Sequence, residues 1–338
     1  MRRQSTQGWA RMSCLPSAPE SKRTATRVRR GLVRDGVASI PASDLSRCSS
    51  SLADEFQRDP DAPVRDGLVH WCKREPGRSV AAVCLSRDIL STVSEPAARP
   101  IQAYWKCLHR AGIVKRLVDL ITGGPARHVA RIAYQMRACQ ITTPEPLAWA
   151  VRSNRAGQSH YLLTVAIPHS ETADLYFARD RDLRGCPSSR TSEPFLERAA
   201  RLSLLARLLR RLHSERFDHR DLKLQNILIS QPGTSPGVWL LDLDGVRRWP
   251  WSSRTRAVQN LSRLAVSAHV RGLASYSDQL RFLQRYLTET GAADPSSAGG
   301  FTSRSGWSPS DWKWWWRAIS QRAQQKLRQN QRRGRPLS

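Results

Sequence analysis

The chain has 338 residues, 40% of them hydrophobic, and carries a formal net charge of +27. This length suits one large domain, or two lobes with tails, and the hydrophobic share can supply a real core. No run approaches the roughly 20 apolar residues of a membrane-spanning helix. The seven cysteines are scattered, without any CxxC spacing, which argues against a zinc site or a disulfide framework. We therefore expect a reducing compartment, by default the cytoplasm.

The two ends of the chain are especially basic. Residues 1–34 carry a net charge of +8 and residues 317–338 carry +7. We expect residues 1–62, which are rich in Ser, Pro, Arg and Asp, to be a disordered extension, and residues 321–338 to be a basic tail. The start lacks the apolar segment of a secretory signal. Basic proteins bind nucleic acid, phosphorylated sugars or acidic membrane surfaces, although simple solubility is an alternative reason for the charge.

The first half of the ordered chain predicts a small β-rich lobe, over residues 63–168. Two strand-like runs flank a Pro-Gly turn, a third strand follows, and then come a helix and a second hairpin. In chain order the expected elements are strands at 67–74, 79–86 and 101–108, a helix at 126–139, and strands at 147–151 and 160–168.

The second half, residues 169–320, predicts a mainly helical lobe. The strongest helix spans 192–215, where leucines form an apolar stripe and arginines occupy the opposite face. Two short strands, "NILIS" and "VWLLDLDGV", then form a hairpin, and helical patterns resume at 255–290 and 310–328. The expected fold class is α+β, with two lobes arranged as in protein kinases.

One motif points to phosphoryl transfer. Residues 219–226 read "HRDLKLQN" and match the catalytic-loop pattern H-R-D-L-x-x-x-N of protein kinases. Phosphoryl transfer needs a carboxylate to orient the attacking hydroxyl, oxygen ligands for Mg²⁺ and cations on the phosphates. The match assigns Asp221 as the base, Asn226 as a metal ligand and Lys223 as the group that reaches the transferred phosphate. His219 and Arg220 would hold the loop in shape.

Two further residues fit the same chemistry. Asp242 in "LLDLDG" lies where the second metal-binding Asp of a kinase belongs, and the predicted hairpin brings it to the same end as Asn226. Lys106 in "YWKCL", on the third predicted strand, is the candidate to bind the phosphates of ATP. Asp244 occupies the position of the Gly in the DFG motif of kinases.

The chain resembles the lipopolysaccharide kinase (Kdo/WaaP) family, whose members are related in fold to protein kinases. The resemblance extends over about residues 68–290 and rests on "PGRSVAAVCL", "AYWKC", "ITTPEPLAW", "HRDLKLQNILI", "WLLDLDGV", "NLSRLAVSA" and "DQLRFLQRYL". It implies an ATP- and Mg²⁺-dependent kinase that phosphorylates a sugar hydroxyl of the lipopolysaccharide core or a related cell-envelope glycan. The implied partners are ATP, an anionic sugar or glycolipid acceptor and, at the inner face of the membrane, an acidic lipid surface.

Some features depart from that pattern and leave two alternatives open. No Gly-rich loop is present, and the helix expected at 126–139 contains no Glu or Asp to hold Lys106. A pseudokinase that binds ATP in a regulatory role is therefore one alternative. A basic nucleic-acid-binding protein is the other, supported by the tails and by the tryptophans of residues 307–316. It leaves the kinase motifs unexplained and ranks last. We expect Trp312, Trp315, Trp316 and Ile319 to share one helical face that serves packing or an interface.

Overall fold

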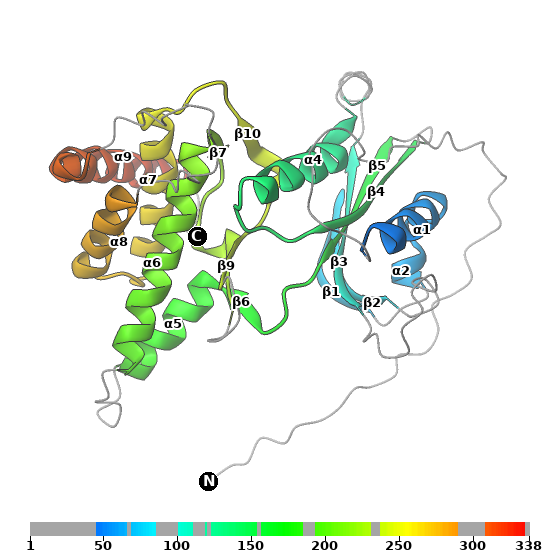
Figure 1. Cartoon of the computed structure of the whole chain (residues 1–338), viewed down its shortest axis with the longest axis horizontal. Coiled ribbons are helices and arrows are strands. Elements are labelled where there is room, and N and C mark those ends of the chain that lie inside the picture. The colour runs from blue at the N-terminus through cyan, green and yellow to red at the C-terminus, as the bar shows by residue number, and fades with distance from the viewer. Residues whose placement is uncertain are drawn as a thin grey trace, which may run out of the picture.

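A five-stranded antiparallel sheet forms the N-terminal half of the protein (Figure 1), in the strand order β1-β2-β3-β5-β4. The computed structural model describes residues 45–65, 69–85, 101–110, 119, 123–153, 157–184, 193–230, 237–289 and 308–334. The strands are β1 (Val69–Glu75), β2 (Arg78–Leu85), β3 (Ile101–Arg110), β4 (Pro146–Ser153) and β5 (Gln158–Val165). All five predicted strands are therefore present, within a few residues of the expected bounds.

Helices cover both faces of this sheet, with α4 (Gly124–Ala138) on one side and α1 (Leu45–Arg58) and α2 (Ala62–Arg65) on the other (Figure 1). Side chains of a strand alternate between the two faces. On β3, Trp105 joins the core beneath α1, so Lys106 lies on the opposite face. That face looks toward the C-terminal half.

The expectation of disorder through residue 62 is wrong for residues 45–62. The helix α1 packs on the sheet through Leu52 and Phe56, which are 4% and 2% exposed, and Trp105 Nε1 donates a hydrogen bond to the Pro60 carbonyl at 2.7 Å. Leu52 and Phe56 lie four residues apart and share one helix face, which is enough to bind a mostly polar helix to the sheet. Residues 1–44 lie outside the described residues.

The C-terminal half is mainly helical and contains two small sheets (Figure 1). One sheet has the order β6-β8-β9 and the other pairs β7 with β10. The helices are α5 (Ala173–Arg184), α6 (Glu193–Ser214), α7 (Arg254–Val270), α8 (Tyr276–Thr288) and α9 (Trp312–Arg332), and the strands are β6 (Ser170–Thr172), β7 (Phe217–His219), β8 (Ile227–Ser230), β9 (Val238–Leu240) and β10 (Val246–Arg248). This confirms the predicted α+β class, with a β-rich first half and a helical second half.

The helix α9 runs through most of the segment that we expected to be a tail after residue 320. Its indole Trp315 is fully buried and lies 5.8 Å from the ring of Tyr286, while Trp316 and Ile319 pack against the same core. These contacts fix the start of α9, and the helix continues to Arg332. The structure thus confirms packing for Trp315, Trp316 and Ile319 of the predicted face, whereas Trp312 of that face is exposed, as is Trp314.

The segment between α4 and β4 forms hydrogen bonds that link the two halves. The Leu240 N–H donates to the Thr142 carbonyl at 2.9 Å, and the Thr143 hydroxyl donates to the Leu240 carbonyl at 2.8 Å. On α4, His128 Nε2 donates to the Val246 carbonyl at 2.9 Å. These bonds hold both sides of residues 241–245 against the N-terminal half, and that segment contains Asp242.

Candidate active site

The predicted catalytic loop connects β7 to β8 and is anchored by a buried histidine. His219 is 1% exposed and its Nε2 lies 2.8 Å from the carbonyl oxygen of Leu241. Burial lowers the pKa of His219, so the ring is neutral and Nε2 carries the proton that is donated. One side chain thus ties the start of the catalytic loop to the residue that precedes Asp242, which is the structural role expected from the motif.

Within the loop, three of the predicted site residues contact one another. The Asn226 amide nitrogen donates to the Asp221 backbone oxygen at 2.8 Å and to its Oδ2 at 3.2 Å. Lys223 Nζ lies 3.1 Å from the same Oδ2. The contacts with Asn226 and Lys223 hold the Asp221 carboxylate in place. Because the side chain is 57% exposed, the carboxylate remains accessible to a substrate.

The backbone brings Asp242 beside this loop. In the β8–β9 hairpin Ile227 pairs with Leu240, and the Leu241 N–H donates to the Asn226 carbonyl at 2.8 Å. Asp242 follows with φ 54° and ψ 62°, a left-handed conformation that few residues other than Gly adopt, although Asn, Asp and His do so more often than the rest. Residues held in such conformations cluster at functional sites. The hairpin therefore places Asn226 and Asp242 at the same end, as predicted.

Lys106 reaches Asp242 from the other half of the protein. Its Nζ lies 3.3 Å from Asp242 Oδ1 and 2.7 Å from Asp244 Oδ2. Arg78 Nη2 lies 3.5 Å from the same Asp242 oxygen. Burial alone would raise the pKa of Asp242, but the charges of Lys106 and Arg78 outweigh it and the pKa is lowered. The carboxylate is thus ionised at neutral pH, beside two cations.

The sequence assigned no role in the site to two residues of this cluster, Asp244 and Arg78. Asp244 follows Asp242 by two residues and is an acidic partner for Lys106, for which the helix α4 offers none. The feature of the sequence that indicated Asp244 is the second acidic residue of "LDLDG". Arg78 begins β2 directly after Gly77. Its position, as a cation at the turn of the first hairpin, was the only feature of the sequence that indicated a role in the site. Both assignments depend on how the two halves meet.

The residues of the site fit a magnesium ion shared with phosphates. Mg²⁺ is usually bound through one or two protein oxygens together with phosphate oxygens and water. Asp242 offers an ionised carboxylate, and because the Asn226 amide nitrogen is used twice, the carbonyl oxygen of that side chain is left for a cation. Among the described residues no group of three or more His, Cys, Asp or Glu could hold a metal, so any ion here would need the phosphates as further ligands.

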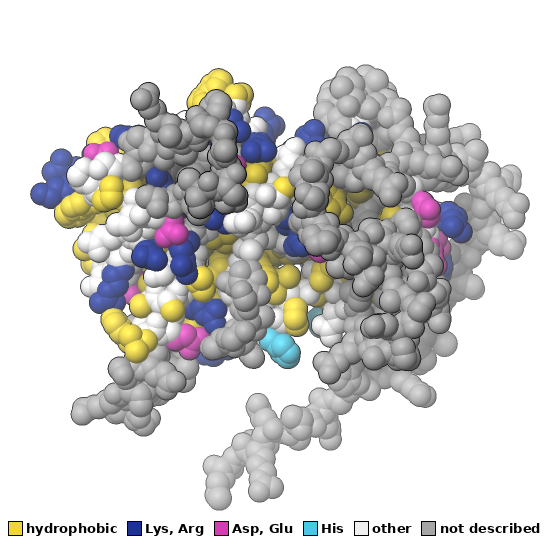
Figure 2. Space-filling model, in the orientation of Figure 1, with side chains coloured by type: hydrophobic (Ala, Val, Ile, Leu, Met, Phe, Trp, Pro, Cys, Tyr) yellow, Lys and Arg dark blue, Asp and Glu magenta, His cyan; other side chains and the backbone are white. Residues whose placement is uncertain are grey.

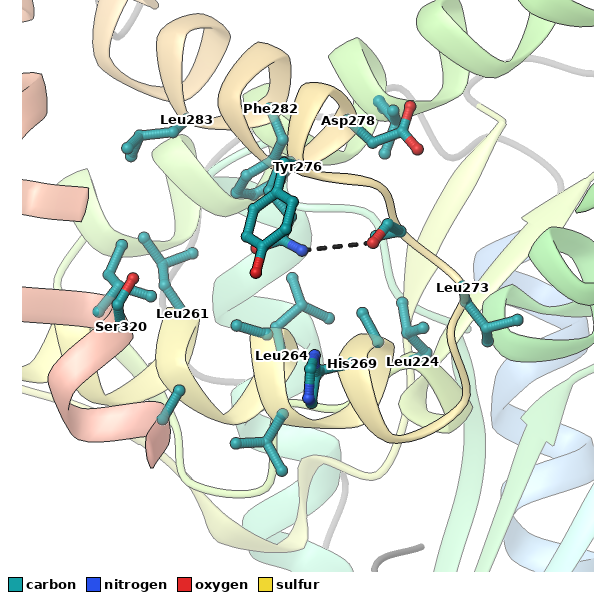
Figure 3. A pocket seen from close by; sticks show the side chains of 18 of the residues that line it. Leu224, Leu261, Leu264, His269, Leu273, Tyr276, Asp278, Phe282, Leu283 and Ser320 are labelled. Atoms are coloured by element: carbon teal, nitrogen blue, oxygen red, sulfur yellow. Dashed lines mark hydrogen bonds between the residues drawn. The ribbon is translucent and has the colours of Figure 1, made fainter. Parts of the chain in front are cut away.

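A separate cavity of about 270 Å³ lies among the helices of the C-terminal half. Figure 3 shows that its walls are mainly aliphatic and aromatic, with Leu261, Leu264, Phe282 and Leu283 facing one another from α7 and α8. Phosphoryl transfer requires charged groups that contact phosphates, and this apolar lining does not offer such a set. The cluster around Asp221 and Asp242 does, and it is the candidate active site.

Together, the fold and this cluster define the class of kinase-like phosphotransferases. The family model described as the lipopolysaccharide kinase (Kdo/WaaP) family matches residues 92–286, more than half of the chain. The chain belongs to this family of kinases, as the sequence resemblance predicted. Among solved structures, a chain described as "WaaP in complex with acyl carrier protein" is similar, with 19% identity and a TM-score of 0.47 over 70% of this chain and 87% of that one. No curated protein sequence matches.

Proposed function

We propose that the protein is an ATP- and Mg²⁺-dependent kinase that phosphorylates a sugar hydroxyl of the lipopolysaccharide core or a related cell-envelope glycan. The observation that carries the proposal is the meeting of Lys106 with Asp242 across the two halves, at 3.3 Å. A cation and an ionised carboxylate from different halves make a charged site where the halves meet, which suits a nucleoside triphosphate and its metal. The family membership supports the same reaction.

Each residue has a part in this reaction. Lys106 and Arg78 bind phosphate oxygens of ATP, and Asp242 and Asn226 would hold a Mg²⁺ ion, which would supply positive charge to the phosphates. Asp221 orients the acceptor hydroxyl and accepts its proton. Lys223, 3.1 Å from Asp221, stabilises charge on the transferred phosphoryl group.

The proposed place of action is the cytoplasmic face of the inner membrane, where a nucleotide and a glycolipid acceptor are both accessible. No helix in the described part of the chain is long and apolar enough to cross a membrane. The excess of Lys and Arg over Asp and Glu, 55 against 28, favours contact with anionic lipid head groups.

The test is transfer of labelled phosphate from Mg-ATP to a cell-envelope glycolipid extract. We expect Asp221→Asn to lower the transfer rate by about 10²–10⁴-fold, the usual contribution of a positioned base, and to leave the Mg-ATP-induced rise in unfolding temperature unchanged. Asp242→Ala should abolish that rise, because the metal loses its carboxylate ligand. Asp182→Asn is the matched control, since Asp182 is an exposed carboxylate on α5 that pairs with Arg181.

The outcome separates an enzyme from a regulatory module. If the wild-type protein binds Mg-ATP but transfers phosphate to no glycolipid or sugar, the pseudokinase alternative holds. If Asp242→Ala leaves the stabilisation by Mg-ATP unchanged, nucleotide binding at this site is refuted.

A further inference from the structure

A basic groove of about 360 Å³ lies between α7 and α9. Its cations are Arg263 of α7, Arg322 and Lys326 of α9, and Arg333 directly after α9, and the remaining lining consists of Ser262 and side-chain amides. Arg322 and Lys326 share one face of α9, because they are four residues apart. Figure 2 shows Lys and Arg side chains recurring over the helical half of the molecule. We call this surface the α7–α9 groove.

The cations of the groove lie close together, and the carboxylates that act on Arg263 and Lys326, those of Asp218 and Asp221, do so through longer-range charge and not through ion pairs. Among the described residues, no carboxylate forms an ion pair with Arg263, Arg322 or Lys326, and Arg263 Nη1 instead donates to the neutral Asn260 Oδ1 at 3.3 Å. Burial, followed by the charge of Arg263, lowers the pKa of Lys326. Burial also lowers the pKa of Arg263; the charge of Asp218 opposes this shift, and the charge of Arg322 adds to it. Cations gathered and partly dehydrated in this way gain from an anion placed among them.

The groove lies next to the catalytic loop. Ser267 of α7 accepts a hydrogen bond from the Leu224 N–H at 3.1 Å, so the helix that forms one wall is attached to the loop itself. The Asp221 carboxylate acts on both Arg263 and Lys326 and partly offsets the lowering of their pKa values. The side of the groove nearest the loop is therefore close to the proposed base.

From this placement we propose that the α7–α9 groove binds a phosphate or carboxylate group of the acceptor, and so holds a neighbouring hydroxyl of the same molecule near Asp221. This inference rests on the proposed function. Arginine forks and side-chain amides match the oxygens of phosphate and carboxylate groups. An acceptor without such a group would lack the contacts that orient its hydroxyl.

The experiment uses the full chain and two probes, glucose 6-phosphate and inorganic phosphate, with neutral glucose as the reference. Binding is followed by calorimetric titration at constant ionic strength, with and without saturating Mg²⁺ and a non-hydrolysable ATP analogue. We expect the wild type to bind both phosphates and not glucose. The double variant Arg322→Gln and Lys326→Gln should bind them about tenfold or more weakly, because two charge-assisted hydrogen bonds are lost.

The control double variant is Arg317→Gln with Arg328→Gln, since both residues are exposed on α9 and neither lines the groove. It removes the same charge, so an equal loss in both double variants would mean unspecific attraction and would overturn the inference. Equal binding by wild type and the groove variant would overturn it too. In either case an intact response to Mg-ATP would leave the proposed function standing, whereas the absence of that response in the wild type would refute the proposed function, whatever the groove binds.

Discussion

Asp244 takes the place of an acidic helix residue as a partner of Lys106. The bond of 2.7 Å to Asp244 is shorter than that of 3.3 Å to Asp242, so Asp244 draws the ammonium group away from the carboxylate proposed to bind the metal. Without Asp244, the lysine would pair with Asp242 alone and compete with Mg²⁺ for it.

We therefore predict that Asp244→Asn raises the Mg²⁺ concentration needed for half-maximal stabilisation by ATP. The expected increase is about tenfold, equivalent to the roughly 1.4 kcal/mol of one charge-assisted hydrogen bond. A magnesium titration followed by thermal unfolding measures it. Asp311→Asn, which removes the partner of Arg254 at 3.3 Å, should not change the requirement. An unchanged requirement in Asp244→Asn would show that Asp244 does not position Lys106.

At the scale of elements, α9 is held by one face of its first turns. Trp315 is fully buried and lies 5.8 Å from Tyr286 and 5.4 Å from Trp314 between ring centres. The adjacent Trp314 is 48% exposed. The two tryptophans thus form a matched pair that differs mainly in burial.

We predict that Trp315→Ala lowers the free energy of unfolding by about 3–5 kcal/mol, the usual cost of removing a buried aromatic side chain. Trp314→Ala should cost less than about 1 kcal/mol, since little apolar area is removed from the core. Chemical denaturation of both variants, followed by circular dichroism, makes the comparison. Similar losses would mean that α9 does not depend on its buried face.

The strands and most helices could be predicted because their hydrophobic patterns are strong and local. The strands β1 to β5 and the helix α6 show such patterns in the sequence, and the loop of residues 219–226 has a specific motif. The helix α1 could not be found in this way, since its contact with the sheet rests on Leu52 and Phe56 within a polar segment. For the site, one motif and its spacing were enough for Asp221, Asn226 and Asp242, whose roles remain proposals.

Stability of the molecule as a whole should depend on buried neutral histidine. His213 lies within the core, where Nδ1 is 2.8 Å from the Tyr286 hydroxyl and Nε2 is 3.1 Å from the Asn260 amide nitrogen. Burial lowers the pKa of His213 to about 3, whereas an unfolded chain has the ordinary value of about 6.5. Below that ordinary value the unfolded chain binds a proton that the folded protein does not, so folding weakens as the pH falls from 6.5 toward 3.

From His213 alone, we predict a loss of about 2 kcal/mol of unfolding free energy between pH 7 and pH 5. His219, whose pKa is also lowered by burial, acts in the same direction. Urea denaturation at a series of pH values should show a shallower pH dependence for His213→Gln than for wild type. The exposed His70 provides the control, as His70→Gln should retain the wild-type slope. Parallel slopes for wild type and His213→Gln would refute the prediction.

The packing of α1 on the sheet also bears on where the protein can be shortened. The family match begins at residue 92, and a fragment cut there would lose α1, α2, β1 and β2 together. The edge of β3 that pairs with β2 would then be bare, a template for pairing between molecules, and Arg78 would be missing from the charged cluster. A soluble shortened form of this kinase should therefore begin before Leu45, well upstream of the segment by which the family is recognised.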